Sequence, residues 1–230
     1  MKKRITIVGC GGTGGHLVHI LGDQRLHLMD GDRVEQGNLA RQGQFVEHDI
    51  GLNKARVLAG ERHTFYDSYV TPDTQWDAFR RPDVVILAVD NHYTRRIVLQ
   101  KAYARATCPP VINVGNELLG AAAEIVLPEW RGGFADPLVA HPEIMEATEP
   151  PDDHNVVHCG ERVKTGEQSV EANMAAALMA AGLVRTWILD PPERAYHDLI
   201  PYMHTMVPSR WTSITRKMRS GNDENQPENV

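Results

Sequence analysis

Residues that could hold a nucleotide gather in the first quarter of the chain. The apolar run ITIVG at 5–9 leads into a glycine-rich turn, and LHLM at 26–29 leads into DGD at 30–32. NLARQ at 38–42 and GLNK at 51–54 follow. A glycine turn, two aspartates, an arginine and a lysine in this order indicate a nucleotide site with cations dedicated to a phosphate chain. The order favours ATP chemistry over simple dinucleotide binding.

The glycine run, GCGGTG at 9–14, fits the pattern GxGxxG that often joins a strand to a helix. Glycine permits a tight turn and a close approach of the backbone to phosphate, and the helix N-terminus adds N–H donors. The same run is compatible with a tight turn that binds no ligand. Its additional glycine, Gly12, is less usual for nicotinamide enzymes.

Two carboxylates follow the second apolar run. Asp30 comes sixteen residues after Gly14, at the end of the run at 26–29. A carboxylate at this strand end can accept hydrogen bonds from the ribose hydroxyls of NAD and of ATP alike. We therefore expect Asp30 to bind ribose, whereas Asp32 either joins it or only caps the turn.

Arg41 and Lys54 follow the ribose acid in a pattern that suits an adenylating enzyme. Such an enzyme must neutralise a triphosphate while a carboxylate attacks the α-phosphorus and pyrophosphate leaves. Arginine makes forked contacts to phosphate, and lysine acts as a point charge. A dehydrogenase has no obvious need for these two cations. Taken singly, each is also compatible with an ordinary surface position.

Asp90 follows the apolar run DVVILAV at 83–89, which has the composition of a buried parallel strand. An aspartate at this strand end could hold Mg²⁺ against the phosphates. Two simpler interpretations stay open. Asn91 could cap the following helix, and Asp90 could be an ordinary acid beside a helix terminus.

The three cysteines, Cys10, Cys108 and Cys159, lie far apart and form no CxxC pair. We therefore expect neither a disulfide framework nor a four-cysteine zinc site. Cys159 follows His158, so it could be an activated nucleophile or, with nearby histidines, a metal ligand. A lone cysteine in a loop is more often neither. The other two cysteines are expected to pack.

Length and charge limit the classes of protein and of partner. A chain of 230 residues with 42% apolar residues predicts one domain, over residues 1–215, with a disordered tail at 216–230. The net charge of −6 argues against a nucleic-acid partner, and the only basic candidate patch, at 210–219, is short. No stretch approaches the ~20 apolar residues of a membrane span. The cytoplasm is the expected compartment.

Apolar runs and helical periods alternate along the chain. We expect strands at 4–8, 26–29, 63–70, 83–89, 110–114, 122–127 and 196–208, and helices at 13–21, 53–61, 91–106 and 168–189. Residues 128–167 show no clean period and are interpreted as an irregular crossover segment. This alternation predicts a doubly wound, mostly parallel Rossmann-like α/β sheet with helices on both faces. Gly9, Asp30 and Asp90 then follow three strand ends, where ligands of such sheets bind.

Four motifs together resemble the E1-like (ThiF/MoeB/ubiquitin-activating) superfamily. They are GCGGTGG, DGDRVEQGNLARQ, GLNKA and DNHYTRR, and their order and spacing cover roughly residues 4–127. The chain looks most like the compact stand-alone bacterial ThiF-domain proteins. The resemblance implies an adenylyltransferase that uses ATP and Mg²⁺ to activate the C-terminal glycine carboxylate of a ubiquitin-like or sulfur-carrier protein. It also implies a homodimer.

The resemblance also implies roles for individual residues. Those expected to bind the nucleotide are Gly9, Gly11, Gly12, Gly14, Asp30, Asp32, Asn38, Arg41, Lys54, Asp90, Asn91 and Arg95. Those expected to act in catalysis are Arg41, Lys54, Asp90 and Cys159, with Asp90 holding Mg²⁺. Three features depart from the family. The N-terminal helices that often supply an arginine to a neighbouring subunit are missing, the paired CxxC zinc motifs are absent, so no zinc is expected, and the catalytic-cysteine loop is not recognisable.

Three alternative functions stay open at this point. The first is a tRNA-modifying adenylating dehydratase, which would be retained on tRNA. The negative net charge of the chain argues against this function. A non-catalytic nucleotide-binding partner module would bind ATP without turnover. An NAD(P) oxidoreductase would bind NAD tightly, and Arg41 and Lys54 would then lack a purpose.

Overall fold

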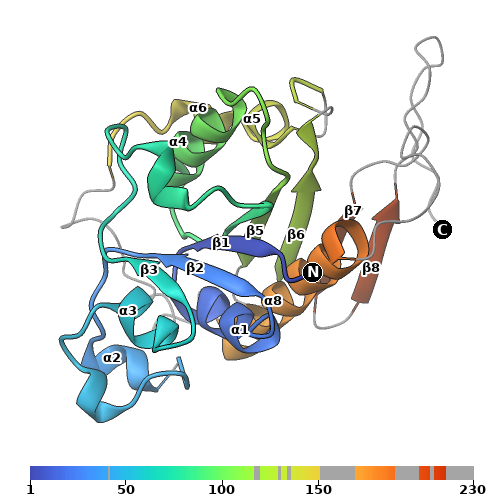
Figure 1. The fold of residues 1–230 in the computed structure, drawn as a ribbon. Coiled ribbons are helices and arrows are strands. Elements are labelled where there is room, and N and C mark those ends of the chain that lie inside the picture. Colours follow the sequence, from blue (N-terminus) through green and yellow to red (C-terminus); the bar gives the residue numbers. More distant parts are fainter. Residues whose placement is uncertain are drawn as a thin grey trace, which may run out of the picture.

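A single eight-stranded sheet forms the centre of the molecule (Figure 1). The structure, a computed structural model, describes residues 1–40, 42–116, 120–128, 131–133, 136–150 and 169–189, with the backbone of two further strands at 202–207 and 210–215. The strand order is β3-β2-β1-β4-β5-β6-β7-β8. Strands β3 to β5 of that order run parallel, and β6, β7 and β8 each pair antiparallel to the preceding strand.

The parallel strands are short and almost wholly apolar. The eight strands are β1 (Arg4–Val8), β2 (Arg25–Met29), β3 (Thr64–Tyr66), β4 (Val84–Leu87), β5 (Val111–Asn116), β6 (Ala121–Val126), β7 (Tyr202–Val207) and β8 (Arg210–Thr215). All four residues of β4 are buried, because helices cover both faces of the sheet. Gly9, Asp30 and Asp90 lie in the segments that follow β1, β2 and β4, so they gather along the edge formed by the carboxyl ends of these strands.

Helices form a layer on each face of the sheet. They are α1 (Gly12–Ile20), α2 (Gln36–Leu39), α3 (Lys54–Ala59), α4 (His92–Tyr103), α5 (Pro137–Ala140), α6 (Pro142–Glu146) and α8 (Val170–Val184), the last continuing into a π-helical segment, Arg185–Leu189. Figure 1 shows α4, α5 and α6 on one face and α1, α3 and α8 on the other. Two short 3₁₀ helices, Glu47–Asp49 and Trp76–Phe79, lie in the connections.

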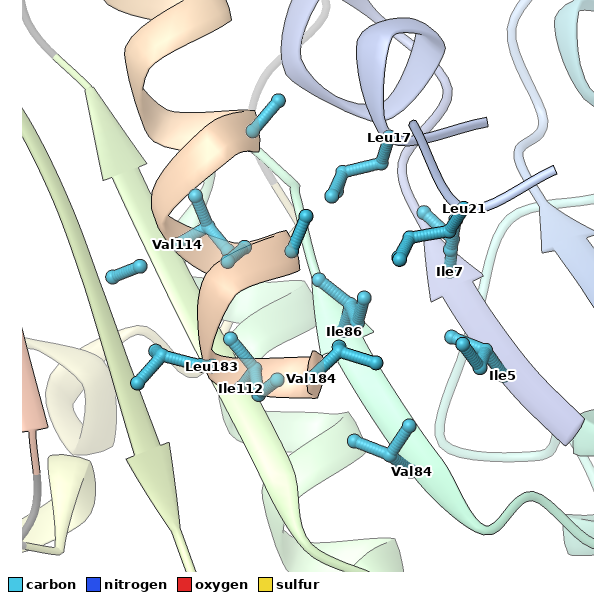
Figure 2. Close-up of a cluster of buried hydrophobic side chains, with 14 of the residues drawn as sticks. Ile5, Ile7, Leu17, Leu21, Val84, Ile86, Ile112, Val114, Leu183 and Val184 are labelled. Atoms are coloured by element: carbon cyan, nitrogen blue, oxygen red, sulfur yellow. The ribbon is translucent and has the colours of Figure 1, made fainter. Parts of the chain in front are cut away.

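Alternate residues of the same strands build two separate cores. On one face, Ile5, Ile7, Val84 and Ile86 of β1 and β4 meet leucines and valines of α1 and α8, including Leu17, Leu21, Leu183 and Val184 (Figure 2). On the other face, Val8, Val85 and Leu87 pack against α4. Burying one such side chain contributes roughly 1.5–3 kcal/mol, so this double packing fixes the strand ends that face the site.

The predicted fold class is confirmed, with differences in the second half. Residues 128–167 were expected to be irregular, yet two short helices, α5 and α6, lie within them. Each begins at a proline, and the Asp136 side chain accepts a hydrogen bond from the Leu138 N–H at the start of α5. The strand expected at 196–208 corresponds to β7, which begins later, at Tyr202, and β8 was not predicted. Strand β8 occupies the segment considered as a basic patch.

Two glycines determine the turn from β1 into α1. A Cβ atom on Gly14 would lie 1.9 Å from the carbonyl oxygen of Gly9. Gly9 itself has a φ of +96°, and a Cβ there would lie 2.5 Å from the carbonyl oxygen of Ala88. Both neighbours are backbone atoms, so they cannot rotate away. These glycines are therefore required by packing, whatever binds beyond them.

Alanine at Gly14 and at Gly182 should change stability in opposite directions. Both positions lie inside helices, but a Cβ on Gly182 has no atom within 4 Å. We expect Gly14→Ala to lower the free energy of unfolding by about 2 kcal/mol or more, through overpacking. Gly182→Ala should raise it by about 0.5–1 kcal/mol, through helix propensity. Urea denaturation measures both, and equal effects would contradict this account of the turn.

Candidate functional site

A cavity of about 390 Å³ opens beyond the carboxyl ends of the parallel strands. Its lining comes from the segments that follow β1, β2, β3 and β4, from the end of β5, from Pro150 beyond α6, and from one residue of α8. Strand β1 lies between β2 and β4, so the strand order reverses direction beside the cavity, where ligands of doubly wound sheets bind. The volume falls within the ~300–1,000 Å³ of small-molecule sites.

Asp30 lies at the end of β2 with both carboxylate oxygens engaged. Its Oδ2 accepts a hydrogen bond of 2.6 Å from the Cys10 N–H, and its Oδ1 accepts one of 2.7 Å from the Asp32 N–H. Burial and, secondly, the nearby Asp32 carboxylate raise the pKa of Asp30 to about 6, against the opposing effect of Lys54 and of the two backbone hydrogen bonds. The two backbone bonds hold this carboxylate in the cavity wall.

Lys54 forms an ion pair across the same wall. Its Nζ donates to Oδ2 of Asp32 at 2.9 Å, and the Tyr69 hydroxyl donates to Oδ1 of the same carboxylate at 2.6 Å. The Lys54 side chain is only 9% exposed, whereas that of Asp32 is 46% exposed. A mostly buried ammonium thus lies beside the cavity, paired with a carboxylate that faces solvent.

Asn53 places Lys54 against the loop at 30–32. Its Oδ1 accepts from the Arg56 N–H and so caps α3, while its Nδ2 donates to the carbonyl oxygens of Asp30 and Asp32 at 2.8 and 3.1 Å. One side chain therefore begins the helix and fastens the loop. This is the local reason why GLNK at 51–54 follows DGD at 30–32 in space.

The segment after β4 combines a cavity residue with structural ones. Asp90 is exposed and lines the cavity. Asn91 also lines it and caps α4, because its Oδ1 accepts from the Thr94 N–H at 2.8 Å. Arg95 lies outside the lining and donates to the carbonyl oxygens of Val89 and Val114 and to the side chain of Asn113.

Burial lowers the pKa of Arg95 to about 10, while Asp90 and Glu124 favour its charged form. The guanidinium joins the segment after β4 to β5 by these contacts. In this structure Arg95 therefore has the role of a clamp behind the cavity wall, and contact with a nucleotide is a separate prediction.

The cavity brings together eight of the residues that were expected to bind the nucleotide, namely Gly9, Gly11, Gly12, Asp30, Asp32, Lys54, Asp90 and Asn91. Gly14, Asn38 and Arg95 do not line it. Asn38 is buried and accepts from the Glu35 N–H, which caps α2. Arg41 and Cys159 lie outside the described residues.

Sequence reasoning did not assign roles to several lining residues, among them Gln42, Tyr69, Asn116 and Asn173. Gln42 is 3% exposed and directly follows Arg41, so its position in the motif was an available signal. Asn173 is the polar exception among the buried residues of α8. Such an exception is a signal in itself, because a buried amide needs hydrogen-bond partners. Tyr69 and Asn116 carry no comparable signal.

Metal and membrane features can be stated for the described part of the chain. No group of three or more His, Cys, Asp or Glu side chains there could hold a metal ion. An ion at Asp90 would thus need oxygen ligands from a bound nucleotide, which is how Mg²⁺ commonly binds. None of the helices described is long and apolar enough to cross a membrane.

Residues 1–161 match the ThiF family. The adenylyltransferase and sulfurtransferase MOCS3 of Sus scrofa is 38% identical over 105 residues, which cover 41% of this chain and 23% of MOCS3. The ATP-dependent ubiquitin transferase-like protein Cap2 of Vibrio cholerae is 29% identical over 158 residues, which cover 60% of this chain and 27% of Cap2. The chain thus spans about a quarter of the length of these relatives.

Two crystal structures share the fold. PaaA has a TM-score of 0.64 and 22% identity, covering 94% of this chain and 64% of PaaA. Escherichia coli MccB with AMPCPP and MccA has a TM-score of 0.63 and 20% identity, covering 95% of this chain and 65% of MccB. At these identities the likeness supports the fold alone.

Asp30 should make stability depend on pH. Because folding raises its pKa from 3.8 to about 6, the folded chain holds this proton more tightly than the unfolded chain. The stability from this group is present at low pH and is lost as pH rises through about 6. Asp30→Asn does not titrate, so its free energy of unfolding relative to the wild type should increase by about 1–2 kcal/mol from pH 4.5 to 7.5, allowing for partial exposure.

Urea denaturation at the two pH values measures this difference. Asp23→Asn, at an exposed position beyond α1, controls for the loss of a surface carboxylate. A difference between Asp30→Asn and the wild type that stays constant with pH would show that folding does not perturb this carboxyl group.

Proposed function

Because residues 1–161, more than half of the chain, match the ThiF family, this chain belongs to that family, and we propose that it uses ATP to adenylate the C-terminal carboxylate of a ubiquitin-like or sulfur-carrier protein. The family resemblance predicted from the motifs is confirmed. The relatives include E1-like adenylyltransferases, which supports adenylation as the general chemistry. The identity of the carboxylate substrate belongs to the proposal.

The observation that supports this proposal most is the composition of one cavity. The glycine turn and the N-terminus of α1, the carboxylate of Asp30, the ammonium of Lys54 and the carboxylate of Asp90 all line it. A triphosphate needs N–H donors and a cation, ribose needs an acceptor, and a phosphate-bound Mg²⁺ needs an oxygen ligand. The cavity wall holds a candidate group for each of these requirements.

The reaction requires alignment and charge stabilisation more than proton transfer. The substrate carboxylate attacks the α-phosphorus, the bond to the β-phosphate oxygen breaks, and pyrophosphate leaves with that electron pair. Lys54, already charged, would offset the charge that develops on the leaving group. Asp90 would hold Mg²⁺, which supplies further neutralisation of the phosphate chain when bound. Asp30 would hold the ribose and so set the position of the α-phosphate.

Further elements of the proposal rest on the family resemblance. They are phosphate contacts from Arg41, a homodimer, a cytoplasmic location, and transfer of the activated acyl group to a thiol or sulfur donor. Cys159 is the candidate thiol. No zinc site is part of the proposal.

Exchange of labelled pyrophosphate into ATP tests the reaction directly. The substrate should be a small protein ending in glycine that is encoded beside this chain, and the same protein without its final glycine is the matched control. We expect exchange with the complete carrier and none with the truncated one. Tight NAD binding that ATP does not compete with, together with no exchange, would instead select an oxidoreductase.

Lys54→Met should weaken binding in proportion to the charge of the ligand. A charge-assisted hydrogen bond contributes roughly 1.5–3 kcal/mol, so the Kd for ATP should rise at least tenfold. The Kd for AMP should rise less, because AMP lacks the β- and γ-phosphates. Lys2→Met removes the same charge at the exposed start of the chain and should leave both constants unchanged. Calorimetry measures all of them, and an equal loss for ATP and AMP would contradict this role.

A further inference from the structure

Helix α8 contributes one polar side chain to the cavity. The buried residues of α8 are alanine, methionine, leucine and valine, with Asn173 as the exception. Asn173 is 6% exposed and lines the cavity. A buried amide in an apolar helix is destabilising unless its polar atoms find partners, so the partners of Asn173 show what the residue does.

The carbonyl oxygen of the Asn173 side chain is fully engaged. Its Oδ1 accepts from the Thr13 hydroxyl at 3.1 Å and from Nδ2 of Asn116 at 2.7 Å. These bonds join α8 to the first turn of α1 and to the end of β5. Because both donors bind Oδ1, they determine the orientation of the amide group and therefore the position of its NH₂ group.

The NH₂ group of Asn173 lies beside the first turn of α1. A Cβ atom on Gly12 would lie only 2.5 Å from Nδ2. Among the described residues, the side-chain hydrogen bonds of Asn173 use Oδ1, and Nδ2 makes none of them. A donor is therefore held next to the N–H groups at the N-terminus of α1, where the helix dipole favours an anion.

We propose that Asn173 is a nucleotide-binding residue, whose Nδ2 donates a hydrogen bond to a phosphate oxygen beside the N–H groups at the N-terminus of α1. This inference rests on the proposed function, because the phosphate is that of the same ATP. It also explains the additional glycine of the run GCGGTG, because any side chain at Gly12 would occupy the place of the amide. Gly12 is thus required by a donor on a distant helix.

Asn173→Asp separates this role from a structural one. An aspartate keeps an oxygen for the Thr13 and Asn116 bonds and replaces the NH₂ donor with a negatively charged oxygen. We expect the Kd for ATP, measured by calorimetry, to rise at least tenfold and that for adenosine to change less than twofold. Adenosine lacks phosphate, so a general distortion of the cavity would weaken both ligands equally, and that result would overturn the inference.

Met174→Asp is the matched control. It places the same charge on the neighbouring residue of α8, which is 46% exposed and does not line the cavity. Both dissociation constants should stay within twofold of the wild type. Unchanged ATP affinity in Asn173→Asp, with normal binding by the wild type, would overturn this inference alone.

Gly12→Ala is a second variant that adds no charge. Its methyl group should displace the Asn173 amide, which is the end of a flexible side chain, and weaken ATP binding about threefold to tenfold with little effect on adenosine. This variant tests the inference even if Asn173→Asp does not fold. Unchanged ATP affinity in a folded Gly12→Ala would then overturn the inference. Failure of the wild-type chain to bind ATP would overturn the proposed function, and this inference with it.

Discussion

The contact between the backbone atoms of Gly14 and Gly9 determines how α1 leaves the sheet. Because no side chain fits between them, the first turn of α1 lies directly against the end of β1. The Gly9 N–H bonds the Met29 carbonyl oxygen, and the Cys10 N–H bonds Asp30, so the same turn holds the end of β2. Thr13, one turn on, reaches Asn173 of α8. This one backbone contact therefore positions α1, the end of β2 and, through Thr13, α8 around the cavity.

The described wall carries more negative than positive charge. Its charged side chains are Asp30, Asp32 and Asp90 against Lys54 alone. Burial and the nearby Asp32 carboxylate raise the pKa of Asp30. A polyanion entering such a site meets repulsion unless cations accompany it. In the proposed function, this balance would favour a nucleotide that arrives with its metal ion over a bare one, with Lys54 as the one positively charged side chain of the described wall.

The sequence predicted the parallel half of the sheet because its signals are local. A run such as VVIL at 84–87 is apolar throughout, and glycine or aspartate follows the predicted runs at 4–8, 26–29 and 83–89. Strands close to β6 and β7 were also predicted, but their antiparallel pairing, strand β8 and helices α5 and α6 were not. These features depend on long-range pairing and on proline-led turns, which leave no clear period in the sequence. The position of a residue within a motif also did not reveal which way its side chain points. Arg95 lies one helical turn beyond Asn91, yet its guanidinium binds carbonyl oxygens behind the wall. Asn173 is separated from Thr13 by 160 residues, so only the fold brings them together.

The clamp formed by Arg95 makes the two sides of the cavity unequal in stiffness. On the β4 side, the guanidinium joins the segment after β4 to β5 and Asn91 caps α4, so this side resists deformation. On the β2 side, Asn53 fastens the backbone of the loop, but the Asp32 carboxylate meets Lys54 and the exposed Tyr69 by side-chain contacts alone, which can rearrange while the backbone stays in place. Induced fit would then be confined to one side of the cavity. The rigid side would act as a fixed reference for the reacting phosphorus while the compliant side adapts to what is bound.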